Sequence, residues 1–371
     1  MIRGQAAPRV PVMRPRLPTS EEVAHRLGEV DRSGWYTNFG PQERALRRRF
    51  ATFIGVDEDR VATAASATVG LQGAATLSPA TSWVLPSFTF PATPMAFLQA
   101  GSEIHFADIC EDDWWLDVST ISRSEATSGL APVAPFGNPF DLTQWNPSRE
   151  VIIDAAASLG ADLPALDRLP ATWAVVFSLH ATKCLPAGEG GLVVFGDPDR
   201  AERFRSWTNF GFDASRRSRA AHLVGTNAKL SELSSVYAHS SLDSWHRIRG
   251  EWLTARDRVD ALEAEHGLVG RPGQRGGVSP YWVVVLPDAR VRSAVERSLD
   301  EHGIDTRRWW ASACHRMPAL AAQPREALPV TEGVSDRILG LPMFRGLDDG
   351  HVARITSALA AARHLWEREA R

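Results

Sequence analysis

Apolar residues recur at helical spacing near the start of the chain. In the segment Thr19–Val30, a Thr and a Glu three residues apart form a candidate capping box, and apolar positions follow at intervals of four and three. The segment Leu46–Gly55 carries three apolar residues at intervals of four and ends in glycine. These patterns predict two amphipathic helices ahead of residue 56.

Short apolar runs then alternate with helical patterns up to about residue 195. Helices are predicted in ASATVGLQGAATL, after a loop, and in PATPMAFLQAG. Six runs rich in β-branched residues read as strands, of the kind buried on both faces of a mainly parallel sheet. They are WVLP, EIHFADI, VAPFG, VIIDAA, WAVVFS and GLVVF. The alternation predicts an α/β layered domain.

The pattern changes after Leu230. Apolar residues at helical intervals up to Leu262 predict a long helix, broken once, that leaves the sheet. Beyond it we expect a strand in YWVVVLP, a helix near 291–302 and a final helix over about 351–369. The sequence thus predicts a large domain over 1–245 and a smaller α+β domain over 246–371.

Composition narrows the possible functions. The 371 residues include 41 basic and 44 acidic side chains that are well mixed, so no long-range field favours nucleic acid or anionic lipid. Neither a stretch of about 20 apolar residues nor the apolar core of a signal peptide is present. The three cysteines show no metal-ligand spacing and suit a reducing compartment. We expect a globular, cytoplasmic protein that binds neither nucleic acid, membrane nor metal.

The scarcity of lysine draws attention to one position. The chain holds Lys183 and Lys229, and its other 39 basic residues are arginines. Arginine serves wherever only positive charge is needed, whereas lysine can also lose a proton near neutral pH. Lys183, in SLHATKCLPAGEGG, is therefore a candidate catalytic residue. The adjacent Cys184 is either a reactive thiol or a small packing residue.

Strand ends place further chemistry near this lysine. Ligands of open α/β sheets bind beyond the carboxyl ends of the strands, where Asp154 and Ser178 are expected. An acid and a lysine at neighbouring strand ends suit pyridoxal phosphate (PLP). The lysine forms the Schiff base, and the carboxylate keeps the pyridinium nitrogen protonated. A structural salt bridge is the competing interpretation of Asp154 and Lys183.

A phosphate site is predicted at the start of the helix after residue 65. Ser66, Ala67 and Thr68 combine small size, hydroxyls and backbone N–H donors, and Ser178 can add a hydroxyl. Phe90 of PSFTFPAT can cover one face of the cofactor ring. Each signal alone has a simpler explanation, since Ser or Thr before a helix is commonly a cap and a single Phe is commonly core.

In combination these motifs resemble the DegT/DnrJ/EryC1/StrS family of PLP-dependent sugar aminotransferases, from about Pro11 to near the C-terminus. The motifs that carry the resemblance are FGP, SAT, PSFTFPAT, DAAAS, SLHATK and GTNAK, with DTRRWW and RILGLPMF as later elements. The resemblance implies the fold type I aminotransferase architecture, with a large mixed, mainly parallel sheet domain and a smaller C-terminal α+β domain.

The resemblance also implies roles for individual residues. Lys183 would be the Schiff-base lysine and Asp154 the pyridinium partner. Asn227 would reach the cofactor phosphate from the neighbouring subunit, which makes a homodimer necessary for activity. The remaining implied cofactor contacts are Ser66, Ala67, Thr68 and Ser178 around the phosphate and Phe90 on the ring.

Two positions depart from the family pattern. Ala157 occupies a position where the family usually has Gln or His in contact with the cofactor ring hydroxyl, and Lys229 replaces an Arg. The first departure leaves open altered chemistry, or a non-catalytic binding or regulatory protein on the same fold. Relatives that dehydrate sugars carry His at the position of Lys183, so this lysine favours transamination.

The implied reaction moves an amino group from L-glutamate to a nucleotide-linked ketosugar, with pyridoxamine phosphate between the two halves. WYTNFGP, TRRWW and the following His315 are similar to members that aminate C4 of a dTDP-4-keto-6-deoxyhexose. A 3-ketosugar or a keto-cyclitol acceptor remains open. Candidate substrate contacts are Trp35, Tyr36, Arg307 and Trp310; aromatic packing and a surface arginine are their competing interpretation.

Overall fold

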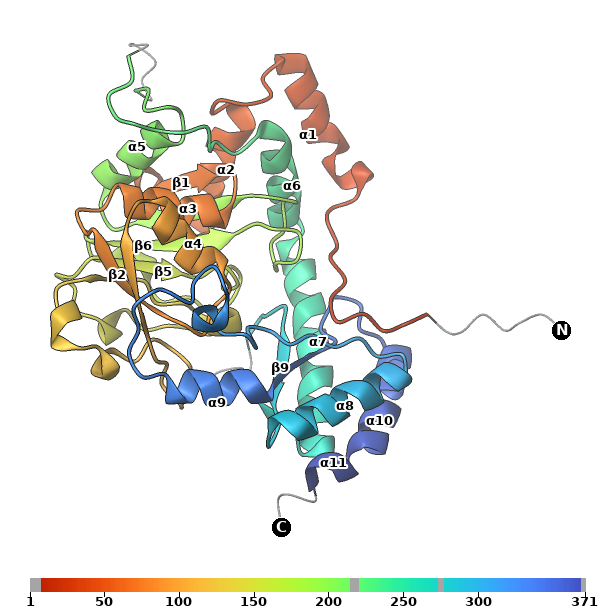
Figure 1. Cartoon of the computed structure of the whole chain (residues 1–371). Coiled ribbons are helices and arrows are strands. Elements are labelled where there is room, and N and C mark those ends of the chain that lie inside the picture. The colour runs from red at the N-terminus through yellow and green to blue at the C-terminus, as the bar shows by residue number, and fades with distance from the viewer. Residues whose placement is uncertain (1–7, 214–219, 273–276, 368–371) are drawn as a thin grey trace.

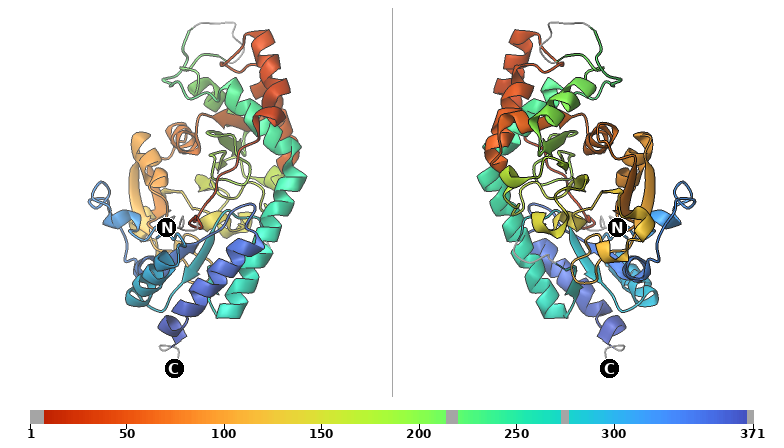
Figure 2. Two further views of the ribbon diagram at one scale, coloured as in Figure 1. Left: turned by 90° about the vertical axis from the view of Figure 1, so that its right-hand side faces the viewer. Right: turned by 90° about the vertical axis from the view of Figure 1, so that its left-hand side faces the viewer.

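The protein is described by a computed structural model that covers residues 8–213, 220–272 and 277–367 (Figure 1). It contains a seven-stranded and a three-stranded sheet. We call helices α1 to α6 and the larger sheet the large unit, and helices α7 to α11 and the smaller sheet the small unit. Side views show one long helical rod running along the molecule from the large unit into the small unit (Figure 2).

The larger sheet is mixed and mostly parallel. Its strand order is β1-β7-β6-β5-β4-β2-β3. Strand β7 is antiparallel to both of its neighbours, and the other pairings are parallel. The bounds are β1 Val61–Ala64, β2 Ser82–Pro86, β3 Glu103–Ala107, β4 Gly129–Leu130, β5 Val151–Asp154, β6 Trp173–Ser178 and β7 Gly191–Phe195. Almost every residue of these strands is buried, which agrees with their continuous apolar runs.

Helices cover both faces of this sheet and form two apolar clusters, one on each side. The bounds are α1 Ser20–Ser33, α2 Pro41–Ile54, α3 Ala67–Thr76, α4 Ala92–Gln99, α5 Pro198–Trp207 and α6 Glu232–Asp243. The predicted capping box of α1 is present, with the Thr19 hydroxyl accepting from Glu22. Helix α2 ends at Gly55, whose φ of 73° favours glycine.

The small unit packs around the antiparallel sheet β10-β9-β8. Its bounds are α7 Trp245–His266, β8 Val269–Gly270, β9 Trp282–Val285, α8 Ala289–Glu301, α9 Pro329–Arg337, β10 Ile338–Leu341, α10 Asp349–Ala362 and α11 His364–Glu367. The predicted long helix has its single break at Ser244, between α6 and α7. The division of the chain into domains 1–245 and 246–371 stays a prediction.

The structure corrects part of the sequence interpretation. VAPFG is not a strand, because only Val133 makes a bridge, to Asp154, and Pro135–Gly137 forms a 3-10 turn. Pro135 has no N–H to donate, and Phe136 has a φ of 54°. The pattern missed the short strands β1, β4, β8 and β10 and the helices α5 and α9. The predicted helix to about residue 369 divides into α10 and α11, and its last predicted residues lie outside the described part.

A buried carboxylate connects the two units. Asp108, directly after β3, is 2% exposed and accepts hydrogen bonds from the backbone N–H groups of Val330 (2.9 Å) and Thr331 (2.8 Å). These residues begin α9, so the carboxylate satisfies donors that a helix N-terminus leaves free. The contact fixes the small unit against the carboxyl end of the larger sheet, where ligands of such folds bind.

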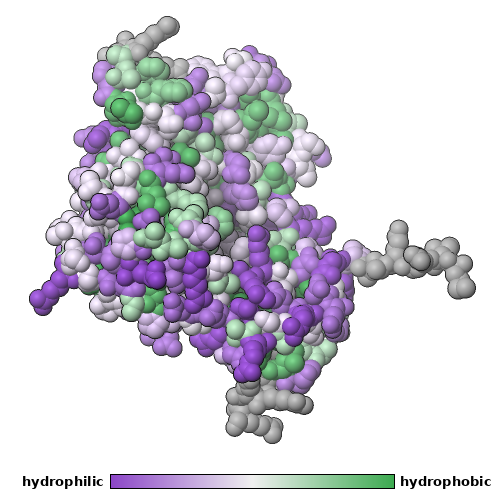
Figure 3. All heavy atoms as spheres, viewed as in Figure 1, coloured by the Kyte–Doolittle hydropathy of each residue, from purple (hydrophilic) through white to green (hydrophobic). Residues whose placement is uncertain are grey.

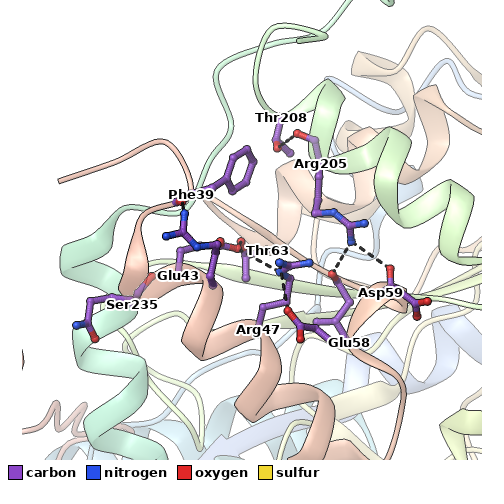
Figure 4. A network of polar contacts seen from close by, with 12 residues as sticks. Phe39, Glu43, Arg47, Glu58, Asp59, Thr63, Arg205, Thr208 and Ser235 are labelled. Atoms are coloured by element: carbon purple, nitrogen blue, oxygen red, sulfur yellow. Dashed lines mark hydrogen bonds and ion pairs between the residues drawn. The ribbon is translucent and has the colours of Figure 1, made fainter. Parts of the chain in front are cut away.

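A second buried carboxylate belongs to Glu43, in the first turn of α2. Its Oε1 accepts a 2.7 Å hydrogen bond from the Thr63 hydroxyl, and Arg47 lies 4.0 Å away (Figure 4). Its Oε2 is buried without a partner in the described part of the chain. Burial, reinforced by the nearby charge of Glu232, raises the pKa of Glu43 above its usual range, although Thr63 and Arg47 oppose the shift.

This raised pKa predicts how Glu43→Gln changes the pH dependence of stability. A folded-state pKa above the unfolded value contributes stability that is fully present below the unfolded pKa and is lost as pH rises through the folded pKa. Gln has no such proton to lose. We therefore expect the Tm of the variant to rise relative to that of the wild type as pH increases from 4 to 8. Thermal unfolding at several pH values measures this, and a constant difference in Tm would contradict it.

Candidate active site

A cavity of about 410 Å³ opens between the large unit and the small unit. Its walls include the carboxyl ends of β5 and β6, the start of α3 and the segment before β9. Nine of the candidate cofactor and substrate contacts line it: Ser66, Ala67, Thr68, Phe90, Asp154, Ser178, Lys183, Arg307 and Trp310. The fold thus brings together residues that are up to 244 positions apart in the chain (310 minus 66).

Asp154 ends β5 and is 5% exposed. Its Oδ2 accepts a 2.6 Å hydrogen bond from the Thr93 hydroxyl, and its Oδ1 accepts one from the Ala156 N–H at 3.1 Å. Burial raises the pKa of Asp154, although these two bonds and the charge of Lys183 act in the opposite direction. A positively charged group bound in the cavity would stabilise the ionised form of this buried carboxyl group, whose pKa is raised.

Lys183 extends into the cavity from the loop that follows β6. Its Nζ donates a hydrogen bond of 2.8 Å to the hydroxyl of Tyr281, and it lies 5.3 Å from the centroid of the same ring. The loop is held by backbone bonds, including that from the Lys183 N–H to the His180 carbonyl. His180 pairs loosely with Glu189 at 3.6 Å, and both side chains line the cavity.

The N-terminus of α3 forms an anion-binding wall. Ser66 is the N-cap, and its hydroxyl accepts from the Val69 N–H at 3.3 Å. In the part of the chain that the structure describes, no partner is present for the N–H groups of Ala67 and Thr68. Ser66, which precedes α3, packs closely on β7, because a Cβ added at Gly191 would lie 2.5 Å from the Ser66 carbonyl oxygen. These free donors at a helix start, with the Ser178 hydroxyl nearby in the cavity wall, suit a phosphate.

Aromatic rings form the opposite part of the cavity. Phe136 and Trp310 stack at 4.1 Å with an interplanar angle of 18°, and they come from different units. Both have positive φ, 54° and 53°, a backbone strain that is typical of functional sites. Phe90 also lines the cavity and is 57% exposed, so it is not the core residue of the competing interpretation.

Four further sequence candidates lie outside this cavity. Trp35 and Tyr36 follow α1, and the Arg44 guanidinium packs over the Trp35 ring at 5.4 Å. Asn227 accepts a 2.7 Å hydrogen bond from Lys229 and precedes α6. His315 is buried and makes a 2.7 Å contact with the Ser87 hydroxyl. The single chain therefore does not bring these residues to Lys183.

Three residues in or next to the cavity were not identified from the sequence. Thr93, which contacts Asp154 from outside the cavity lining, had a weak signal as the hydroxyl that ends the PAT segment after Phe90. Tyr281 is the first residue of the predicted strand YWVVVLP, and an aromatic ring in such a strand indicates a core residue. Met13 comes from the N-terminal segment, which carries no local pattern. Their place at the site depends on tertiary contacts, which residue spacing does not encode.

The described residues show two further properties. No helix among them has the length and apolar character needed to cross a membrane. No group of three or more His, Cys, Asp or Glu side chains among them is arranged to hold a metal ion.

Curated relatives match the chain along most of its length. It is 29% identical to Protein Rv3402c of Mycobacterium tuberculosis, over 97% of this chain and 91% of that protein. It is 28% identical to dTDP-3-amino-3,4,6-trideoxy-alpha-D-glucose transaminase of Streptomyces venezuelae, over 95% and 96%. It is 25% identical to dTDP-4-amino-4,6-dideoxy-D-glucose transaminase of Escherichia coli, over 94% and 98%.

Solved structures confirm the predicted fold class. The crystal structure of DesI in the presence of its TDP-sugar product has a TM-score of 0.83 and 32% identity, covering 99% of this chain and 96% of that one. The model of the DegT/DnrJ/EryC1/StrS aminotransferase family matches residues 18–360. The chain therefore belongs to the DegT/DnrJ/EryC1/StrS aminotransferase family, and it is a PLP-dependent aminotransferase.

Proposed function

We propose that the protein transfers an amino group from L-glutamate to a nucleotide-linked ketosugar. The acceptor we favour is a dTDP-4-keto-6-deoxyhexose, which would yield the 4-amino sugar. The observation that carries the proposal is the cavity that joins Lys183, Asp154 and the N-terminus of α3, in a chain whose relatives include two dTDP-sugar transaminases. DesI, with its TDP-sugar product, supports the nucleotide-sugar class.

The cavity residues fit PLP. Ser66, the free N–H groups of Ala67 and Thr68, and Ser178 would hold its phosphate, and Phe90 would cover its ring. Asp154 would face the ring nitrogen, whose positive charge would stabilise the buried carboxylate. When bound, the cofactor supplies the electron sink that allows the donor to lose the proton on its α-carbon.

Lys183 would hold the cofactor and then move protons. Once freed by the donor, its Nζ would take the proton from the donor's α-carbon and hold it for the rest of the transfer. Tyr281 holds this nitrogen through the 2.8 Å hydrogen bond. Phe136 and Trp310 would restrict water and provide an apolar wall for a deoxygenated face of the acceptor. Arg307 would bind negative charge on either substrate.

A 3-ketosugar is the second candidate acceptor, favoured by the Streptomyces venezuelae relative that is named for a 3-amino sugar. The experiment that decides is a turnover assay with dTDP-4-keto-6-deoxyhexose, its 3-keto isomer and a keto-cyclitol, each with L-glutamate as donor. We expect the 4-ketosugar to have the highest kcat/KM. Turnover of the keto-cyclitol alone would contradict the sugar proposal, and absence of turnover with all three would contradict the proposed pairing of L-glutamate with these acceptors.

The active enzyme is proposed to be a homodimer. Asn227 lies outside the cavity of its own chain, so its contact with a phosphate requires a second copy. Exposed apolar side chains surround its segment: Phe210 (47%), Val224 (94%) and Leu233 (46%). Apolar side chains also gather on the upper half of the face in Figure 3, whereas hydrophilic ones dominate the lower half. A second copy of the chain would cover such a surface.

Mixed dimers test this arrangement. Lys183→Arg and Asn227→Ala are each expected to inactivate their own homodimer. In a mixed dimer, the site that has Lys183 on one subunit and Asn227 on the other is intact. Random reassortment should restore about a quarter of wild-type activity, since half the dimers are mixed and each has one intact site. No recovery, with mixed dimers shown by mass spectrometry, would contradict the shared site.

A further inference from the structure

Tyr281 is the protein group closest to the reacting nitrogen among the described contacts of Lys183. Its hydroxyl accepts the 2.8 Å hydrogen bond from Nζ, and the residue is 9% exposed. Its ring packs edge-on against Phe136 at 5.5 Å and against Trp309 at 5.1 Å. The phenol therefore reaches the cavity from a well-packed ring, with its polar end at Lys183.

A network between the two units fixes Tyr281 in place. Its N–H donates to the Ser279 hydroxyl oxygen at 3.3 Å, and that hydroxyl donates to the Phe136 carbonyl at 2.8 Å. Arg271, 4% exposed, donates to the same carbonyl at 3.1 Å and to Ser279 at 3.2 Å. Burial lowers the pKa of Arg271 to about 9. Burying this cation costs free energy. Its hydrogen bonds to Ser279 and to the Phe136 carbonyl hold Tyr281 in its orientation toward the large unit.

The same segment contacts Ala157. A Cβ at Gly137 would lie 2.6 Å from the Ala157 carbonyl oxygen, so the Phe136–Gly137 segment packs directly on Ala157. Tyr281 packs on Phe136, and both Tyr281 and Ala157 line the cavity. A methyl group offers no hydrogen bond, whereas the usual Gln or His at this position does.

We propose that Tyr281 is a catalytic residue, whose hydroxyl bonds the Lys183 nitrogen and substitutes for the hydrogen-bonding group that the usual Gln or His would offer to the cofactor ring hydroxyl and that Ala157 lacks. The inference rests on the proposed PLP site but not on the identity of the acceptor. Because the phenol oxygen accepts from Nζ, it stabilises the form of this nitrogen that carries a proton. Removing this hydrogen bond is therefore expected to make the protonated form of the PLP-loaded protein less favourable.

Tyr281→Phe removes the hydroxyl and leaves every other charged group around Lys183 in the chain. Those that line the cavity are Asp154, His180, Glu189 and Arg307, and Arg14, Arg16 and Arg345 border a small adjoining pocket with Lys183. Cys184, the next residue in the chain, is buried, and burial raises the pKa of its thiol to about 12. A change at position 281 therefore reports on the phenol alone, provided that the ring remains packed.

The experiment is a pH titration of the visible absorption band of the PLP-loaded protein. Tyr281→Phe keeps the ring and removes the hydroxyl, and it is expected to lower the midpoint of the band by about one pH unit. Tyr237→Phe, the same change in α6 away from the cavity, is expected to leave the midpoint unchanged. An unchanged or raised midpoint in Tyr281→Phe, with an unaltered Tm, would overturn the proposal.

A double variant tests the relation to Ala157. Adding Ala157→Gln to Tyr281→Phe restores a hydrogen-bonding group at the usual position, and it is expected to recover at least half of the shift. No recovery would overturn the claim that Tyr281 substitutes for that group. Neither titration uses a sugar, so failure of the proposed acceptor in the turnover assay is distinct from failure of this inference.

Discussion

Replacing Lys183 by arginine is expected to abolish both the visible band that forms with PLP and the transamination itself. Arginine keeps the positive charge, but its guanidinium stays protonated and cannot form the covalent link or carry the proton. We expect kcat to fall by about 10⁴-fold or more, the upper range for losing a positioned acid-base group that is also the covalent anchor. Absorbance with added PLP and a coupled assay with L-glutamate measure the two effects.

Lys229→Arg is the matched control, because it makes the same chemical change at the other lysine. Lys229 packs over the Phe210 ring at 4.7 Å and lies outside the cavity of its own chain. The control is expected to keep the band. A Lys183→Arg protein that still forms the band and turns over donor would show that another amine anchors the cofactor, and it would remove the basis of the proposed reaction.

Most of the residues predicted for the site line one cavity, and they could be found in the sequence because they sit in local motifs. Asp154 ends an apolar strand, Ser66–Thr68 begin a helix, and Lys183 is one of two lysines, so each has a signal in the chain itself. The sheet rule then places them at one edge. The structure brings all of them to one cavity, although their contacts with PLP remain a proposal.

The rest depended on contacts that local patterns do not encode. Tyr281 and Phe136 are aromatic residues that the sequence pattern assigns to the core. They reach the cavity because the small unit packs on the large unit, where their two rings are in contact. VAPFG has strand-like composition, but Pro135 and the left-handed Phe136 turn it into part of the wall. Strands of two to four residues, such as β8, are too short to give a periodic signal. Asn227 was named from the family resemblance alone, because a residue proposed to act across a subunit boundary does not line the cavity of its own chain.

Asp154→Asn is expected to leave the absorption band in place but to slow its reaction with L-glutamate by about 10³-fold, the effect of losing a preorganised charge at a reacting centre. The amide has nearly the same shape, but it lacks the negative charge that would keep the ring nitrogen cationic. Mixing the PLP-loaded protein with excess donor and following the band in a single turnover measures this rate. A variant that reacts at the wild-type rate would show that the carboxylate does not perform this role.

The pH dependence of PLP binding gives an independent test of the same carboxylate. Because burial raises the pKa of Asp154, its charge is lost as pH falls through that value, and the affinity of the protein for PLP should fall with it. Thr93→Val removes a hydrogen bond that favours the charged form, so the loss should begin at higher pH. Asp154→Asn should lack this acid limb. If all three proteins lost affinity over the same pH range, the titrating group would lie elsewhere in the cavity, and His180 and Glu189 would be the next residues to replace.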